Sequence, residues 1–147
     1  GIIMKHDILW FKTAEPRVRF DLKQITGTVP IIKAYAGMGI GDGIISLLAP
    51  EKIDGVVIEA LGAGNLPPLA AREIKSLMDK GVPVVLVSRC FNGIAEPVYA
   101  YEGGGVKLQE AGVMFVKELN APKARLKLLI ALSAGLEGQE LKDYIEG

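Results

Sequence analysis

Residues 55–67 read Gly55-Val56-Val57-Ile58-Glu59-Ala60-Leu61-Gly62-Ala63-Gly64-Asn65-Leu66-Pro67, and this stretch decides the fold. It opens with an apolar run that does not alternate, which is typical of a strand buried on both faces of a parallel sheet. Gly62 and Gly64 then allow a sharp turn, and proline suits the first turn of a following helix. The stretch therefore predicts a βα unit whose turn places Asn65 at the carboxyl end of a buried strand.

Comparable units are predicted on both sides of this stretch, because short apolar runs alternate with helical patterns that glycine and proline separate. Strands are expected at 29–36, 56–60, 84–88 and 113–116. Helices are expected at 43–48, between Asn65 and Gly81, at 125–134 and at 139–145. The alternation predicts an α/β fold, a small three-layer domain with a four-stranded parallel sheet flanked by helices.

The two longest helical patterns each carry one apolar face. That face is expected to contain Leu69, Ile74, Leu77 and Met78 in the helix after Asn65, and Leu126, Leu129, Ile130 and Leu132 in the helix at 125–134. Residues 1–28 mix aromatic and polar residues without a clear period, so we expect an irregular lead-in or connector there. Residues 29–147 are then expected to form the domain itself.

Composition limits the classes of function. The 147 residues fit one domain, and half of them are hydrophobic. The mean hydropathy is high at +0.32, yet no apolar run approaches the roughly 20 residues that cross a membrane. We therefore expect no membrane partner, and an apolar surface that meets another domain or subunit. Seventeen basic residues balance seventeen acidic ones without a basic stripe, which argues against a nucleic-acid partner.

Cysteine and histidine are too few for several kinds of site. The single cysteine, Cys90, cannot form an internal disulfide, which indicates a reducing, cytoplasmic compartment. We interpret Cys90 as a small buried hydrophobe and His6 as a surface residue. One histidine and one cysteine provide no cluster of soft ligands, so no metal is expected. Few Asn, Gln and Cys beside plentiful Lys and Glu indicate a thermophilic source.

Two glycine-rich turns are candidates for ligand binding. The glycines at 37, 39, 41 and 43 follow a predicted strand, but their spacing never gives Gly-x-Gly-x-x-Gly, so we interpret them as a βα loop and expect no cofactor. The turn at 61–65 leaves the amide of Asn65 with both a donor and an acceptor. It reads either as a cap of the following helix or as a binding group at the crevice where strands end.

Four segments, in this order, resemble the C-terminal domain of the L-asparaginases, above all the archaeal type. They are Val29-Pro30-Ile31-Ile32-Lys33-Ala34-Tyr35-Ala36, the run from Asp54 to Asn65, Gly81-Val82-Pro83-Val84-Val85-Leu86-Val87-Ser88-Arg89-Cys90, and Pro122-Lys123-Ala124-Arg125. The related amidotransferase subunit that acts on misacylated tRNA shares them. The resemblance implies the hydrolysis of L-asparagine to L-aspartate and ammonia, and the fold of the asparaginase C-terminal domain, which is Rossmann-like without dinucleotide binding.

The resemblance also implies which parts of the enzyme are expected here. The family keeps its Thr nucleophiles in an N-terminal domain, and the threonines at 13, 26 and 28 match no nucleophile motif. We therefore expect no catalytic residue in this chain, and an N-terminal asparaginase domain as its partner in a homodimer. In the family, the active site lies between the N-terminal domain of one subunit and the C-terminal domain of its neighbour.

The resemblance implies substrate-binding roles for Asn65 and for one residue of the loop at 91–105. Loop lengths differ within the family, which leaves Tyr99, Glu96, Tyr101 and Glu102 open. Tyr99-Ala100 matches a Tyr-Ala pair of cytoplasmic members, so Tyr99 is the first choice and Glu96 the second. Solvated loop residues without a role are the alternative. For the whole chain, the alternatives are the amidotransferase subunit and a non-catalytic module that binds a small molecule or serves assembly.

Overall fold

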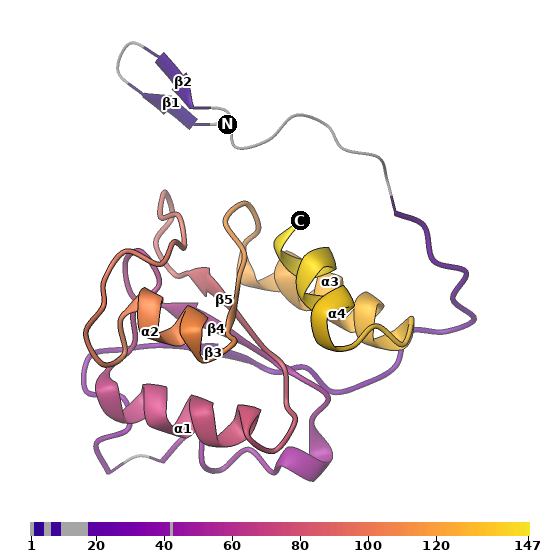
Figure 1. Cartoon of the computed structure of the whole chain (residues 1–147), viewed down its shortest axis with the longest axis horizontal. Coiled ribbons are helices and arrows are strands. Elements are labelled where there is room, and N and C mark those ends of the chain that lie inside the picture. Colours follow the sequence, from indigo (N-terminus) through magenta and orange to yellow (C-terminus); the bar gives the residue numbers. More distant parts are fainter. Residues whose placement is uncertain (1, 5–6, 10–17, 42) are drawn as a thin grey trace.

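The computed structural model describes residues 2–4, 7–9, 18–41 and 43–147. A parallel sheet of four strands lies at its centre, in the order β3-β4-β5-β6. The strands are β3 (Ile31–Lys33), β4 (Val56–Ala60), β5 (Val84–Ser88) and β6 (Met114–Phe115). Figure 1 shows α1 and α2 on one side of this sheet and α3 and α4 on the other. The predicted three-layer α/β fold is confirmed.

The two central strands are buried on both faces, as their continuous apolar sequence predicts. Alternate residues of β4 and β5 belong to two separate clusters of buried side chains. Val56, Ile58, Val84 and Leu86 pack toward the cluster that includes Ile74 and Leu77 of α1. Val57, Val85 and Val87 pack toward the cluster that includes Leu128 of α3 and Leu141 of α4. The register of the two strands, Val56 opposite Val84 through Ala60 opposite Ser88, brings their carboxyl ends level.

The positions of the long helices agree with the sequence better than their buried faces do. The helices are α1 (Pro68–Met78), α2 (Gly105–Glu110), α3 (Ala121–Ser133) and α4 (Gly138–Glu146). Ile74, Leu77 and Leu129 are buried as predicted, but Leu69 is 40% and Leu126 51% exposed. Both predictions were wrong because Leu69 lies to the side of the buried face of α1, and Leu126 lies on the side of α3 opposite Ala124 and Leu128, which face the sheet.

Two further elements differ from the prediction. Residues 43–48 form turns and no helix, because Gly43 has a left-handed φ of +53° at one end and Pro50 follows at the other. The short 3-10 helix η1 (Pro50–Lys52) comes next. Helix α2 was not predicted at all. Its six residues are too few to establish a helical period in the sequence.

The segment before residue 29 is less irregular than expected. β1 (Ile2–Met4) and β2 (Asp7–Leu9) pair antiparallel. From residue 18 the chain runs along the layer of α3 and α4, where Phe20 meets the ring of Tyr144 edge-on at 5.2 Å. Thr26 exchanges two hydrogen bonds of 3.1 Å with the hydroxyl of Ser133. The division into a lead-in at 1–28 and a domain at 29–147 stays a prediction. No helix in the described part of the chain is long and apolar enough to cross a bilayer.

Candidate functional site

The turn after β4 closes on itself through its backbone. Leu61 and Asn65 form an isolated antiparallel bridge, in which each N–H donates to the other's carbonyl oxygen at 2.9 Å. Gly64 is buried inside this turn at a φ of +111°. A Cβ at that position would lie 2.8 Å from the ring of Phe115. The turn therefore requires glycine there, both for its backbone conformation and for its fit against β6.

Asn65 does not present a free amide. Its Oδ1 accepts a hydrogen bond of 3.3 Å from the N–H of Gly105, the first residue of α2. Among the hydrogen bonds of the described residues, none uses its Nδ2 group as a donor. Asn65 caps neither end of α1, whose N-cap residue is Pro67. The interpretation as a cap of that helix was wrong, because the chain continues extended through Leu66 before α1 begins.

The loop that contains Glu96 and Tyr99 is fastened to this same turn. The N–H of Glu96 donates to the carbonyl oxygen of Ala63 at 2.8 Å, and that of Leu66 donates to the carbonyl oxygen of Gly103 at 2.8 Å. Together with the bond from Gly105 to Asn65, three contacts join two segments that are about 40 residues apart. The structure thus brings the sequence-predicted residues to one region at the carboxyl ends of β4 and β5.

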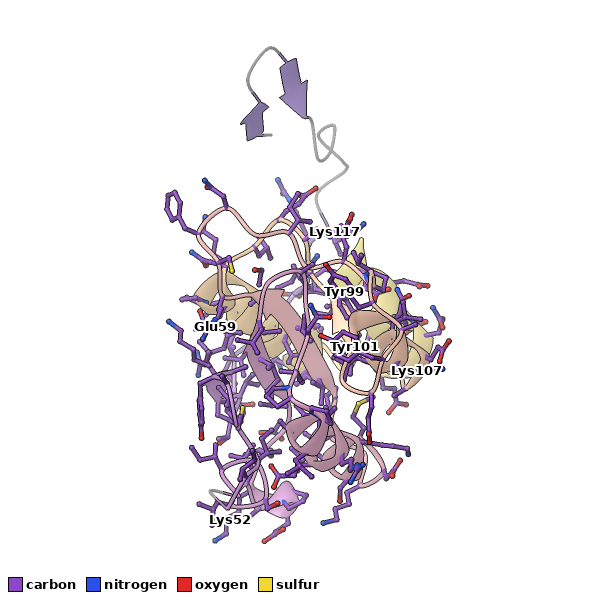
Figure 2. The ribbon with its side chains drawn as sticks, turned by 90° about the vertical axis from the view of Figure 1, so that its left-hand side faces the viewer. Lys52, Glu59, Tyr99, Tyr101, Lys107 and Lys117 are labelled. Carbon is purple, nitrogen blue, oxygen red and sulfur yellow. The ribbon has the colours of Figure 1, made fainter. Side chains whose placement is uncertain are left out.

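The two candidates in the loop are not equivalent in the structure. The carboxylate of Glu96 pairs with the ammonium group of Lys117 at 2.8 Å, across to the segment after β6. Tyr99 uses only its carbonyl oxygen in the described hydrogen bonds, and its side chain is 51% exposed. Its ring lies 6.0 Å from that of Tyr101. In Figure 2 the two tyrosines lie between Lys117 and Lys107, and Lys52 is at the opposite end of the molecule.

A second ion pair holds the far side of the loop. Arg72 of α1 binds Glu102 through two hydrogen bonds, Nε to Oε1 at 2.6 Å and Nη2 to Oε2 at 3.0 Å. The bond from Arg72 lowers the pKa of the Glu102 carboxyl, and the same bond raises the pKa of the guanidinium. Both ions are fully formed at neutral pH. Sequence reasoning missed Arg72, because nothing in a helix at residue 72 signals a contact with residue 102.

Cys90 is exposed, which overturns its interpretation as a buried residue. The strand β5 ends at Ser88, and the chain then leaves the cover of the helices. Ser88 fixes this exit, since its hydroxyl donates to the carbonyl oxygen of Gly62 at 2.7 Å and accepts from the N–H of Cys90 at 3.1 Å. Ser88 also lines a cavity of about 280 Å³, together with Cys90, Lys117 and Lys123 among others. A mixed, open cavity of this kind suits a small polar ligand better than an apolar one.

The remaining candidates do not come together in the part of the chain that the structure describes. Among residues 18–41 and 43–147, no three His, Cys, Asp or Glu side chains are grouped so that they could hold a metal ion. His6 and Thr13 lie outside the described residues. Thr26 and Thr28 both belong to the backbone framework of the lead-in, where the N–H of Thr28 donates to Asp54 at 2.6 Å. The described part of the chain thus offers binding groups around the 61–65 turn, with a cysteine nearby.

Comparisons with known proteins agree with this architecture. The profile of the Glutaminase/Asparaginase C-terminal domain matches residues 28–145. A probable L-asparaginase of Deinococcus radiodurans is 44% identical over 133 residues, which are 90% of this chain and 39% of that protein. A glutamyl-tRNA(Gln) amidotransferase subunit of Pyrococcus furiosus is 33% identical over 132 residues, which are 89% of this chain and 29% of that protein.

A solved L-asparaginase structure is also similar to this chain. L-asparaginase I from Vibrio cholerae matches with a TM-score of 0.70 at 27% identity, over 91% of this chain and 40% of that chain. This chain therefore spans well under half the length of these relatives. Because the family profile covers residues 28–145 and the fold matches that of a solved asparaginase, this chain belongs to the Glutaminase/Asparaginase C-terminal domain family.

Proposed function

We propose that this chain is the C-terminal part of an L-asparaginase and that it completes a substrate site whose nucleophile belongs to an N-terminal domain. The observation that supports this most is the junction of the Asn65 turn with the Tyr99 loop at the carboxyl ends of β4 and β5. Ligands of open α/β sheets bind at that edge. The relatives named L-asparaginase are similar to this chain over the same region.

In this proposal the residues of the chain bind substrate and do no covalent chemistry. L-asparagine and water give L-aspartate and ammonia, and the attack on the amide carbon belongs to a threonine of the other domain. Asn65 Nδ2 and the phenol of Tyr99 are suited to the polar end of an amino acid, since they add hydrogen bonds without adding charge. Glu96 is the weaker candidate, because Lys117 already pairs with its carboxylate.

Exposed apolar side chains in two segments of the chain support a partner. Ile40, Ile44 and Leu47 follow β3, and Phe91, Val98, Tyr99 and Tyr101 follow β5, all of them at least 38% exposed. Large apolar surfaces of this kind mark places where another chain docks. We propose that they contact the N-terminal domain and the second subunit of a homodimer. The single cysteine further supports a reducing compartment, and the archaeal, thermophilic subtype stays a proposal.

The first prediction tests this function by reassembly. The N-terminal part of the Deinococcus radiodurans relative, without the 39% that this chain matches, is produced separately and mixed with this chain. Neither part alone should release ammonia from asparagine, and the mixture should do so with a rate that saturates as the complex forms. Light scattering of the active species should give two copies of each part. Turnover by this chain alone, with contaminants excluded, contradicts the proposal.

The second prediction concerns Asn65, for which two variants separate two roles. Asn65→Ala should lower kcat/KM of the assembled enzyme, with a loss of transition-state stabilisation of about 1–3 kcal/mol. It should also destabilise the loop, since it leaves the N–H of Gly105 unpaired. Asn65→Asp keeps an acceptor for that N–H, and replaces the amide donor with a second, negatively charged acceptor. It should therefore retain the melting temperature but not the activity. If Asn65→Asp has full activity, Asn65 serves only to anchor the loop.

One observation favours a second function. The tRNA-dependent amidotransferase protein of Pyrococcus furiosus is similar to this chain over nearly the same number of residues as the asparaginase. The same binding groups would then serve the release of ammonia for a tRNA-bound substrate. The reassembled protein distinguishes the two, because ammonia release that requires charged tRNA and the other amidotransferase subunits supports this alternative, and release without them supports an asparaginase.

A further inference from the structure

The tip of the Tyr99 loop is joined to the start of α2 by two backbone hydrogen bonds, from Gly104 to Tyr101 and from Val106 to Tyr99, but its side chains lie open to solvent. Val98, Tyr99 and Tyr101 are each more than half exposed. The backbone bonds to the 61–65 turn secure the two ends of the loop, at Glu96 and at Gly103 to Gly105, and leave the residues between them without such a bond. A tip of this kind is expected to move among several conformations unless side chains restrain it.

The bidentate pair of Arg72 with Glu102 is a side-chain restraint that ties this tip to α1. A guanidinium that binds both carboxylate oxygens fixes the plane and direction of its partner, whereas a single bond leaves it free to turn. The side chains of Arg72 and Glu102 are 64% and 55% exposed. Exposed pairs add little to global stability, so the contribution of this pair is local.

The position of this pair in the chain sets it apart from other exposed pairs of the described helices. Lys75 with Asp79 and Lys107 with Glu110 join neighbouring turns of one helix. Arg72 and Glu102 are 30 residues apart and join α1 to a loop that the helix does not otherwise order.

Glu102 is connected to Tyr99 through the backbone between them. The N–H of Gly104 donates to the carbonyl oxygen of Tyr101 at 2.8 Å, and that of Val106 donates to the carbonyl oxygen of Tyr99 at 3.0 Å. The ring centroids of Tyr99 and Tyr101 lie 6.0 Å apart. Figure 2 shows the two residues next to each other. A carboxylate held at 102 therefore restrains the turn that carries both tyrosines.

We propose that Arg72 is a positioning residue, which holds Tyr99 in place for substrate by clamping Glu102 to α1. The effect on substrate rests on the proposed function, whereas the effect on the loop does not. Both partners of the ion pair belong to this chain, so the pair needs no substrate to form. It orders the loop before binding and so reduces the entropy that binding would otherwise cost.

Hydrogen exchange of the amides of Gly104 and Val106 tests, in this chain alone, whether the Arg72–Glu102 pair restrains the loop. Arg72→Gln and Glu102→Gln should each speed their exchange about 2- to 5-fold, the range that an exposed ion pair supports. The double variant Arg72→Glu with Glu102→Arg should restore most of the protection. Lys75→Gln breaks an exposed pair on the same helix that does not touch the loop, and it should leave both rates unchanged.

Salt gives a second readout. One molar NaCl should speed exchange at Gly104 and Val106 in the original chain but have little effect in Arg72→Gln, because only the original chain has the pair to screen. Unchanged exchange in Arg72→Gln, or a double variant no better protected than the single ones, overturns the proposal.

In the assembled enzyme, Arg72→Gln should raise KM for asparagine about 2- to 5-fold and change kcat by less than about 2-fold, because the lost order is regained on binding. A variant that lowers kcat with KM unchanged contradicts a positioning role. If the exchange rates respond as expected but no assembled protein hydrolyses asparagine, the proposed function is wrong, whereas the restraint of the loop by the Arg72–Glu102 pair is confirmed.

Discussion

Gly103→Ala should lower the free energy of unfolding by about 3 kcal/mol or more, the largest effect we expect from a single methyl group. Gly103 has a φ of +87°, which costs an alanine about 1–2 kcal/mol. A Cβ would also collide with the carbonyl oxygen of Leu66. That atom is backbone and cannot turn aside, and the hydrogen bond from the N–H of Leu66 to Gly103 would be strained with it.

A matched glycine isolates the collision. Gly135 has a φ of +78°, but nothing lies within 4 Å of its Cβ position. Gly135→Ala should therefore show only the cost of the backbone conformation, about 1–2 kcal/mol. Urea denaturation of both variants measures the difference. Equal losses of stability would mean that the loop at 96–105 shifts away from Leu66 without cost and is not fixed as the structure shows.

Leu128→Ala should cost about 2–5 kcal/mol, the range for a leucine truncated in a core. Leu128 is fully buried in α3, and its Cδ2 fills the space above Gly55, at the start of the central strand. Gly55 has no side chain that could move into the cavity left behind. We therefore expect a cost in the upper half of this range.

Leu126 of the same helix is the control. Its side chain is 51% exposed, so Leu126→Ala should change the free energy of unfolding by no more than about 0.5 kcal/mol. Thermal and urea denaturation monitored by circular dichroism compare the two variants. Similar losses for both would mean that α3 does not lie on the sheet with the face that the structure gives it.

These two residues also illustrate what the sequence could predict. Helix α3 and the strands β4 and β5 are evident from their apolar periods, because a fully buried strand and an amphipathic helix leave different patterns. The rotation of the helix is not evident to the same accuracy. Leu126 and Leu128 are both apolar, and the position of the sheet decides which of them is covered, since Leu128 packs over Gly55.

The candidate site could be predicted in part. The turn at 61–65 is a local feature, so its glycines and Asn65 stand out in the sequence. Its partners do not, because the bonds from Gly105 to Asn65 and from Arg72 to Glu102 join residues that are 40 and 30 positions apart. No local pattern encodes such contacts. The exposure of Cys90 was missed for a similar reason, since it depends on where the helices stop covering β5.

The order of the strands has a consequence for synthesis on the ribosome. Strand order equals chain order, so each strand joins an edge that has already been made. The face that holds Ile58 and Leu86 receives α1 and α2 as the sheet grows. The opposite face, with Val57, Val85 and Val87, depends on residues of α3 and α4, which leave the ribosome after all four strands. In a nascent chain translated as far as residue 120, the face with Ile58 and Leu86 is thus covered, whereas the face with Val57, Val85 and Val87 is still exposed. Exposed apolar surface of this kind is what chaperones bind.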